Sequence, residues 1–585
     1  MKKIYLILLI LAVIIISGYL YLRFSVLKTT NVKTDSLKSR EFKPDNSKAK
    51  SVLDLRPALI AKLQQLVNAG SNGLYILSID RLEPNVLDSK LDAYRVSIMP
   101  DSAALIKLDQ SKAAPDNVFR ISFDSLHIDG IGINDLLHKD KIDLESIYVS
   151  YPHIKMIHKE RAYNNLKRKQ NDSLTLYHRI MKEMKSVRIG KINIEHGMFI
   201  HQDIAHQNKV TKFNDVTIHI NKLLIDSTTQ HDNSRFFFAE SALLTCGNYF
   251  FATPDSLYYF KAKTITVSGN EHTLTASNVT LLPRGSRDQF EKKLSHIQNM
   301  YTINIPKLSF TAINWYDLIN HKNLVAKEMN IFSGSFSVYL NRALPLDTNK
   351  IQNFPNQVLM KIPLPISISK ITVHNFNFNY TEYNPAIEKE GTLYIDEINS
   401  SIMNLTNMPS QIKVQRYSTL KGTAKFMHTV PMIAGFNFDM QHYKTGNFTA
   451  DVHVGKLDTS IVNPIARPLG EFMIKTGTVS EGTAHIEGDN FGASGKGLLL
   501  YNDLRIEPLK KAPGKEGGLK KKTFTSFFAN AFFIKNNNPS KGETPRSPEF
   551  TYERKPHSTF FSFAWKAIST GILKTIGLPT KLADK

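Results

Sequence analysis

The sequence predicts a mainly β fold. One N-terminal transmembrane helix precedes an elongated, curled, groove-like antiparallel β-sheet with internal duplication, capped by amphipathic helices. Three observations predict this fold: an apolar run near the N-terminus, alternation of apolar and polar residues at period two from about residue 74 to 506, and recurrence of one segment of this region further along the chain. With 42% apolar residues among 585, the chain can bury a large surface.

The apolar run near the N-terminus extends from Ile4 to Leu22, between Lys2-Lys3 and Arg23. At about 1.5 Å per residue it spans roughly 28 Å as a helix, close to the hydrocarbon thickness of a bilayer. A cleaved signal peptide would have a shorter apolar region of about 7–15 residues, so an uncleaved anchor is favoured. The two lysines predict a cytoplasmic N-terminus with the bulk of the chain outside the cytoplasm, although basic residues after the run argue the other way.

The bulk charge and the cysteine content narrow the classes of partner and of site. The net charge is +22, but the basic residues are spread along the chain. An anionic membrane surface is therefore as good a partner as nucleic acid, and the anchor argues against nucleic acid. The single cysteine, Cys246, excludes an internal disulfide and a CxxC site, and we expect a buried thiol in a strand.

The chain divides into six predicted segments. A polar linker separates the anchor from an amphipathic helix, from about Leu53 to Asn68, with Gly70 as its stop. We expect this helix to dock on the β body as an end cap, which is favoured over membrane contact. The predicted boundaries are 1–27 for the anchor, 28–50 for the linker, 51–72 for the helix, 73–298 and 299–507 for two β-groove repeats, and 508–585 for a basic linker followed by apolar and amphipathic helices.

The β region repeats itself. The segment that starts at Phe119 aligns without a gap with the segment that starts at Tyr301, at an offset of 182 residues (301 minus 119). The matched apolar pairs are Ile121 with Ile303, Phe123 with Ile305, Leu126 with Leu308, and Ile128 with Phe310. The alternation slips by one residue at Asp124-Ser125 and again at Pro306-Lys307, where a β-bulge tolerates proline. Further on, the segment from Ile189 resembles the segment from Ile368, which matches Ile192 with Ile371 and Ile194 with Val373.

The C-terminal part of the chain ends in a predicted helix over residues 557–578. Its apolar stripe consists of Phe560, Phe561, Ala564, Trp565, Ile568, Ile572 and Ile576. The stripe either closes the end of the body or contacts a membrane or a partner protein. Closure is favoured.

A search for chemistry finds no nucleophile elbow, P-loop, dinucleotide fingerprint or metalloprotease helix. His196, His201 and His206 recur every five residues, which places neighbours on opposite faces of a strand, so surface histidines are favoured over a metal site. Asp135 and Asp317 hold equivalent repeat positions, where a carboxylate caps a short helical turn. The sequence therefore predicts no enzyme, no catalytic residue, no cofactor and no metal.

Residues 461–507 resemble the C-terminal region of the AsmA-like proteins, relatives of TamB and of the bridge-like lipid-transfer proteins. The matching elements are Asn463-Pro464, Gly477-Thr478-Val479, the glycine-rich strand from Gly492 to Gly497, and Tyr501-Asn502-Asp503-Leu504. The resemblance implies a periplasmic β-groove held in the inner membrane by residues 4–22. It implies a phospholipid or another acyl-chain lipid as ligand, and envelope proteins as further partners at the C-terminal end.

The apolar strand positions are the candidate lining of such a groove, because shielding an acyl chain from water is worth about 0.8 kcal/mol per CH₂. The candidates are Ile121, Phe123, Leu126, Ile128, Ile192, Ile194, Ile303, Ile305, Leu308, Phe310, Ile371 and Val373. Ordinary core residues under a helix or second sheet would have the same pattern. Three functions stay open: a non-enzymatic lipid-handling groove that contributes to phospholipid transport or outer-membrane homeostasis, a scaffold for assembly of outer-membrane proteins or surface glycans, and an extracytoplasmic enzyme.

Overall fold

The computed structural model is mainly β, with 57% strand and 16% helix, which confirms the predicted class. It describes residues 56–85, 87–130, 141–164, 177, 186–204, 209–230, 232, 234–253, 255–347, 351–470, 472–511, 519–521, 534–578 and 580. The predicted anchor and linker, together with Asp135 and His206, lie outside these ranges. Among the helices of the described ranges, none is long and apolar enough to cross a membrane.

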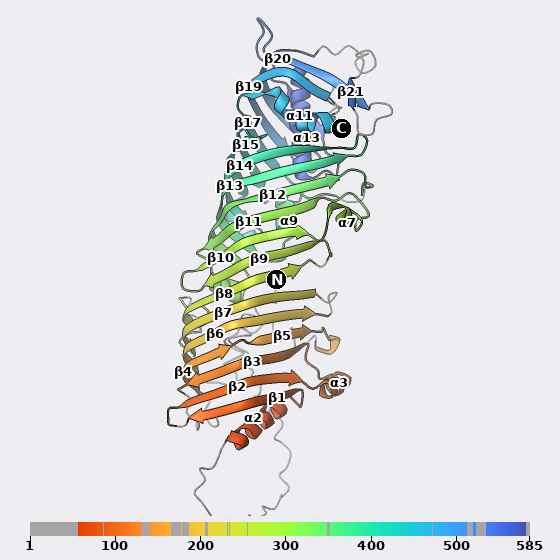
Figure 1. The fold of residues 1–585 in the computed structure, drawn as a ribbon. Helices are drawn as coiled ribbons and strands as arrows, with labels where there is room; N and C mark the ends of the chain where they lie inside the picture. Colours follow the sequence, from red (N-terminus) through yellow and green to blue (C-terminus); the bar gives the residue numbers. More distant parts are fainter. Residues whose placement is uncertain are drawn as a thin grey trace, which may run out of the picture. The chain divides into compact units, whose positions relative to one another are not determined.

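The chain, drawn as a ribbon in Figure 1, divides into two compact units. The first unit holds residues up to 254 together with 263–272 and 319–321, and the second holds the remainder from residue 255. The elements before residue 273 are α2 (Arg56–Gly70), β1 (Tyr75–Asn85), β2 (Lys90–Pro100), α3 (Ser102–Gln110), β3 (Asn117–Asp129), β4 (Lys141–Ser150), β5 (His153–His158), a 3-10 turn (Ala162–Asn164), β6 (Ser186–Asp203), β7 (Lys209–Ile225), β8 (Ala239–Ala252) and β9 (Tyr258–Ser268), whose residues are divided between the units.

The remaining elements begin at residue 273. They are β10 (Thr273–Pro283), α7 (Arg287–Glu291), β11 (Met300–Thr311), α8 (Trp315–Asn320), β12 (Leu324–Asn341), α9 (Pro355–Met360), β13 (Ile366–Asn384), β14 (Lys389–Thr406), α10 (Pro409–Val414), β15 (Tyr417–Phe426), β16 (Val430–Asp439), β17 (Phe448–Val454), β18 (Leu457–Asp458), a 3-10 turn (Thr459–Val462), α11 (Asn463–Gly470), β19 (Phe472–Gly488), β20 (Gly492–Lys511), β21 (Leu519–Lys521), β22 (Glu549–Glu553) and α13 (Phe560–Ile576).

The strand pairing corrects the prediction of a purely antiparallel sheet, because each unit contains a parallel join. In the first unit β4 and β5 pair in parallel with β6, and in the second β12 pairs in parallel with β13. A parallel join needs a long crossover connection. The chain supplies one in each case, over residues 159–185 and 342–365. A period of two shows that strands exist but does not show their direction.

The pairing register agrees with the alignment of the two sequence segments. The first unit pairs Leu126 with Val149 and Val149 with Ile194, and the second pairs Leu308 with Ile331 and Ile331 with Val373. The next rung pairs Ile128, Ile147 and Ile192 in the first unit, and Phe310, Met329 and Ile371 in the second. Residues matched in sequence therefore occupy matched positions in the ladders.

The predicted slip in the alternation is also present. Phe123 and Leu126, three residues apart, pack into the same cluster, as the slip requires. In β6 the buried Ile194 and Phe199 are five residues apart, and a register shift lies between them. His196, within this bulge, has a φ of 55°. The bulge returns the apolar side chains to one face after the strand bends.

The helix α2 caps the first strand of the first unit, as predicted. Val67 is buried, and Ile60 and Leu63 pack beside it on a cluster that includes Leu77 and Leu82. Figure 1 shows α2 beside β1. The docking interpretation of this helix is therefore confirmed for the side chains that the structure describes.

Candidate functional site

The apolar face of the first unit is closely packed. Side chains paired directly across strands share one face, and one row of this face joins Ile128, Ile147, Ile192 and Ile220. Ile192 is 1% exposed and Ile194 in the next row is 0% exposed. These two candidate lining residues are therefore core residues. Ile121 is also buried, whereas Phe123, Leu126 and Ile128 are half-buried.

The second unit carries a longer apolar row, which crosses its strands from β10 to β22. Its members, in pairing order, are Leu274, Phe310, Met329, Ile371, Ile402, Leu420, Phe436, Ala450, Ile486, Gly495 and Phe550. At Gly495 a Cβ would lie 2.7 Å from the ring of Phe550, so glycine is required for the ring to lie over the strand. The row gives the second unit a continuous apolar face.

The opposite face of the same strands is polar. The neighbouring row consists of Thr275, Ser309, Asn330, Thr372, Ser401 and Lys421. This difference between the faces is expected for a sheet with one face packed against the core and the other face in solvent. Consecutive residues such as Leu308 and Ser309 lie on opposite faces, so substitutions at these two positions compare the apolar face with the polar face.

On the apolar face of the second unit, the β11 positions and Val373 are only half-buried. The half-buried candidates are Ile303, Ile305, Leu308, Phe310 and Val373, whereas Ile371 is buried. Repeat mates thus differ in burial: Ile194 is 0% exposed, and its mate Val373 keeps part of its surface open. Whether these positions line a lipid groove stays a prediction.

The helix α13 packs on this apolar face, and Figure 1 shows it running across the strands. Phe560, at its first turn, has its ring centroid 5.0 Å from that of Phe448 and 6.0 Å from that of Phe436. Phe563 is 0% exposed within the same cluster. The closing role predicted for the C-terminal helix is confirmed within the second unit.

The buried face of α13 is rotated relative to the predicted stripe. Ala567 is fully buried, whereas Phe561 and Trp565 of the stripe are 61% and 40% exposed. The reason is close packing: a Cβ on Gly571 would lie 2.7 Å from the ring of Phe550, so small residues face the strands. Of the other stripe residues, Phe560, Ala564 and Ile576 are buried and Ile568 and Ile572 are half-buried.

The exposed edge of α13 continues an aromatic series on the sheet. Ring centroids are 5.8 Å apart for Tyr301 and Phe336, 5.7 Å for Phe336 and Phe378, and 5.8 Å for Phe378 and Phe561. The half-buried face of β11–β13 therefore runs without interruption to Phe561.

The residues that carry the AsmA-like resemblance have structural roles. Asn463 exchanges two hydrogen bonds of 2.9 Å with the backbone of Ile474. Gly477 has a φ of 140°, and a Cβ there would lie 2.8 Å from the Thr459 hydroxyl oxygen. The buried Tyr501 donates from its hydroxyl to Lys535 O at 2.8 Å, and it packs with Leu573 of α13. These motifs hold α11 and α13 in place.

A buried arginine ties α13 to two other segments, and sequence reasoning missed it. The Arg554 side chain donates from Nη2 to Gln352 O (2.6 Å) and Ser558 O (3.3 Å), and from Nη1 to Asn490 Oδ1 (3.3 Å). Its guanidinium lies 4.2 Å from the centre of the Phe354 ring. Burial lowers the pKa of Arg554. The sequence signals only the segment that Arg554 contacts: Phe354-Pro355-Asn356-Gln357 has the proline and glutamine spacing typical of a helix start.

The described residues offer no centre for metal chemistry. No group of three or more His, Cys, Asp and Glu side chains in this part of the chain could hold a metal ion. His196 is exposed and hydrogen-bonded to Asp215, whereas His201 is buried, which corrects the surface placement predicted for His201. In α8 the Asn314 side chain accepts from the backbone N–H of Asp317 in the first turn (Asp317 N to Asn314 Oδ1, 3.0 Å).

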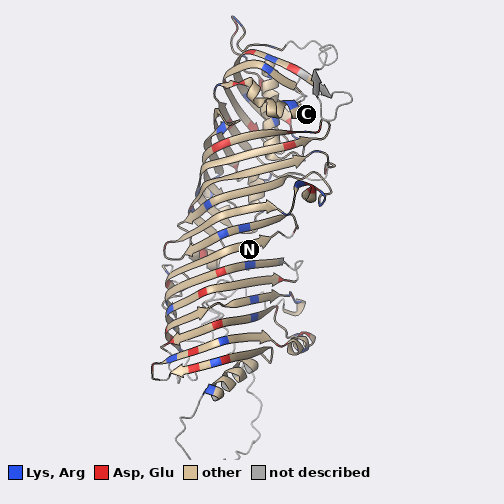
Figure 2. Ribbon diagram, viewed as in Figure 1, with Lys and Arg blue, Asp and Glu red and all other residues tan. Residues whose placement is uncertain are grey.

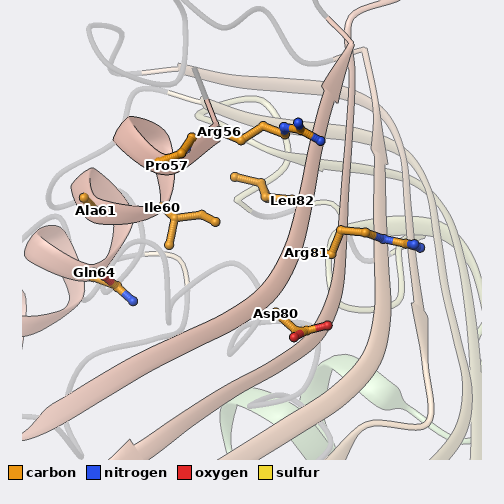
Figure 3. Close-up of a pocket in the computed structure, with 8 residues that line it drawn as sticks. All are labelled: Arg56, Pro57, Ile60, Ala61, Gln64, Asp80, Arg81 and Leu82. Carbon is orange, nitrogen blue, oxygen red and sulfur yellow. The ribbon is translucent and has the colours of Figure 1, made fainter. Parts of the chain in front are cut away.

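A cavity of about 400 Å³ lies between α2 and β1 in the first unit (Figure 3). Arg56 and Ile60 line it from the helix, and Asp80 and Arg81 from the strand. Asp80 already forms an ion pair with Arg95. Figure 2 shows acidic and basic positions interspersed along the strands of each unit, as expected from the spread of charge in the sequence.

Cys246 is a buried thiol in β8, as predicted, and we expect it to be inert in the folded chain. Burial raises the pKa of its thiol from an ordinary value of 9.0 to about 12. Near pH 8 this shift lowers the thiolate fraction by roughly a thousandfold. An aromatic disulfide reagent should therefore react only after urea is added. Stoichiometric reaction of the folded chain would contradict the placement.

Comparison with protein-family models and with curated protein sequences finds no match to this chain. The AsmA-like resemblance therefore rests on the motifs alone.

Proposed function

We propose that the second unit binds lipid acyl chains on its apolar face. In this proposal residues 4–22 anchor the chain in the inner membrane, and the bulk of the chain lies in the periplasm. The chain contributes without catalysis to phospholipid transport between membranes or to outer-membrane homeostasis. The observation that carries the proposal is the continuous apolar row from β10 to β22, beside which Ile303, Ile305, Leu308 and Val373 stay half-buried.

The chemistry of a sheet face favours hydrocarbon over an extended polypeptide. The backbone N–H and C=O groups of β11–β13 are used in ladder hydrogen bonds, so the face presents side chains only. An extended peptide laid on this face would leave its own backbone groups without partners, which costs about 1–3 kcal/mol for each group. An acyl chain has no such groups and gains about 0.8 kcal/mol for each CH₂ removed from water.

The helix α13 supplies the end of the proposed site. Its buried face fills the apolar face over β16, β17 and β22, and its exposed Phe561 meets Phe378. In this proposal an acyl chain lies along β11–β13 and ends against Phe561 and Trp565. The predicted contact residues of the C-terminal helix would then contact lipid inside the site.

A photo-crosslinker tests the site in the full-length chain within its membrane. Benzoylphenylalanine replaces Leu308 on the apolar face, and in a matched variant it replaces Ser309, the next residue of β11 on the polar face. After irradiation, mass spectrometry of the β11 peptide should find an acyl-lipid adduct at position 308 and several-fold less at position 309. Equal adduct formation at the two positions, or none at position 308, would contradict the proposal.

A further inference from the structure

Large apolar side chains are exposed at one edge of the second unit, in loops where β13–β17, β19, β20 and β22 start or end. Ile351 lies before α9, Val358 lies in α9, Val414 ends α10, and Phe491 lies at the tip between β19 and β20. Their exposed fractions are 68%, 52%, 78% and 75%. We call segments 351–361, 409–416, 440–447, 489–491 and 554–556 the loop edge.

Hydrogen bonds hold the segments of the loop edge together. Gln357 Nε2 donates to Asn490 Oδ1 and to Lys444 O, both at 3.1 Å, which joins α9 to two turns. Arg554 donates from Nη2 to Gln352 O at 2.6 Å and from its backbone N to Phe491 O at 2.9 Å. This network includes Phe491 itself. It also includes Gln352 and Gln357, the sequence neighbours of Ile351 and Val358.

The remaining segment joins through a small apolar cluster. Ile412 of α10 packs with Leu359 of α9 and with Met440, all of them buried. Gln441 Nε2 donates to Ile412 O at 3.4 Å. The exposed Val358 and Val414 thus lie beside buried residues that anchor their helices. The four exposed side chains belong to one packed edge.

The same edge is basic. Its segments contain Lys361, Lys413, Arg416, Lys444, Arg554 and Lys555, and their one carboxylate is Asp489. Arg554 is buried, and Arg416 pairs with Asp439 at the end of β16. Lys413 and Lys444 are exposed and form no ion pair within the described part of the chain. The loop edge therefore carries exposed apolar residues and exposed cations together.

We propose that the loop edge docks on an anionic lipid bilayer. Apolar side chains at loop tips insert at the boundary between headgroups and acyl chains, and the lysines between them attract anionic headgroups. A protein partner would need a surface that matches the positions of these apolar and basic side chains. A bilayer can bind them at any spacing. The proposal does not depend on lipid binding by the apolar face, because it uses different residues.

A fluorescent label at position 491 tests the docking in the full-length chain. Cys246 is buried, so a Phe491→Cys variant takes up an environment-sensitive nitrobenzoxadiazole label at the new position only, and the unsubstituted chain is the labelling blank. The chain is reconstituted in vesicles of phosphatidylcholine, with or without about one third phosphatidylglycerol. Bromine-labelled lipids are placed in the same vesicles or in added ones, so that contact with either bilayer is detected.

With phosphatidylglycerol present, we expect emission from position 491 to shift to shorter wavelength and to be quenched by bromine-labelled lipid. A matched label at Ile433→Cys should show neither change, because Ile433 is 54% exposed on β16, away from the loop edge. Replacing Lys413 and Lys444 with alanine should weaken the association about fivefold for each lysine.

Three outcomes would overturn the proposal. The first is a label at position 491 that reports water in every vesicle. The second is an equal response in phosphatidylcholine alone, because the lysines would then play no part. The third is a crosslink from position 491 to an envelope protein in cells without any response to vesicles, which would assign the loop edge to a protein partner. None of these outcomes bears on the adduct test at Leu308.

Discussion

Replacing Phe563 with alanine is expected to lower the free energy of unfolding of the second unit by about 3–5 kcal/mol. The side chain is 0% exposed, and its ring centroid lies 5.5 Å from that of Phe354, 6.0 Å from that of Tyr552 and 6.2 Å from that of Phe448. These contacts join α13 to α9, β17 and β22. Truncation would remove the apolar contacts and leave a cavity that the surrounding strands cannot fill.

Phe561→Ala is the matched control, two residues earlier in the same helix. Its side chain is 61% exposed and contacts Phe378 and Phe560, so we expect a loss below about 1 kcal/mol. Hydrogen exchange of α13 amides in the full-length chain measures both variants locally, which avoids assuming that the two units unfold together. Similar protection losses in the two variants would contradict the packing of α13 described above.

Replacing Arg554 with methionine is expected to destabilise the same region by about 3 kcal/mol or more. The substitution keeps a long apolar stem but removes the donors to Gln352 O, Asn490 Oδ1 and Ser558 O. An acceptor left buried without a donor costs about 1–3 kcal/mol. The guanidinium stacked on Phe354 is lost as well.

Two further variants isolate the cause of the effect of Arg554. Lys at position 554 keeps a charge but cannot reach the same acceptors with a planar fork, so we expect it to recover only part of the stability. Lys555→Met, at the exposed neighbouring position, should change stability by less than about 0.5 kcal/mol. Chemical unfolding followed by exchange of the α9 and α13 amides checks all three. If the Lys variant matched the original chain, the hydrogen-bonding role would be wrong.

Several features could be predicted from the sequence because local pattern determines them. Period-two alternation identified the β class, and the shared slip at Asp124-Ser125 and Pro306-Lys307 identified the aligned segments, because a bulge displaces the pattern in the sequence itself. The spacing of Ile60, Leu63 and Val67 identified an amphipathic helix that docks on the first strand. The membrane anchor and the lipid ligand stay predictions.

Other features depend on residues far apart in the chain. Leu308, Ile192 and Ile194 have the same apolar, strand-type pattern, yet Leu308 is half-buried and the other two are fully covered. In α13 the predicted stripe includes Phe561 and Trp565, which are exposed, whereas close approach to Phe550 turns Ala567 and Gly571 toward the strands. Burial on one face is set by what packs over it, and no periodicity within the strand or helix contains that information.

The sequence by itself determined that this chain is a β protein with two matched segments, one cysteine in a strand, and amphipathic helices at the ends of its β region. Only the tertiary structure decided that each unit contains a parallel join, that the face of β11 is half-open while that of β6 is closed, and that Arg554 ties α13 to α9. Side-chain alternation fixes which residues share a face. Strand direction and the covering of that face are fixed by crossovers and by contacts between segments hundreds of residues apart in the chain, such as Gln352 and Arg554.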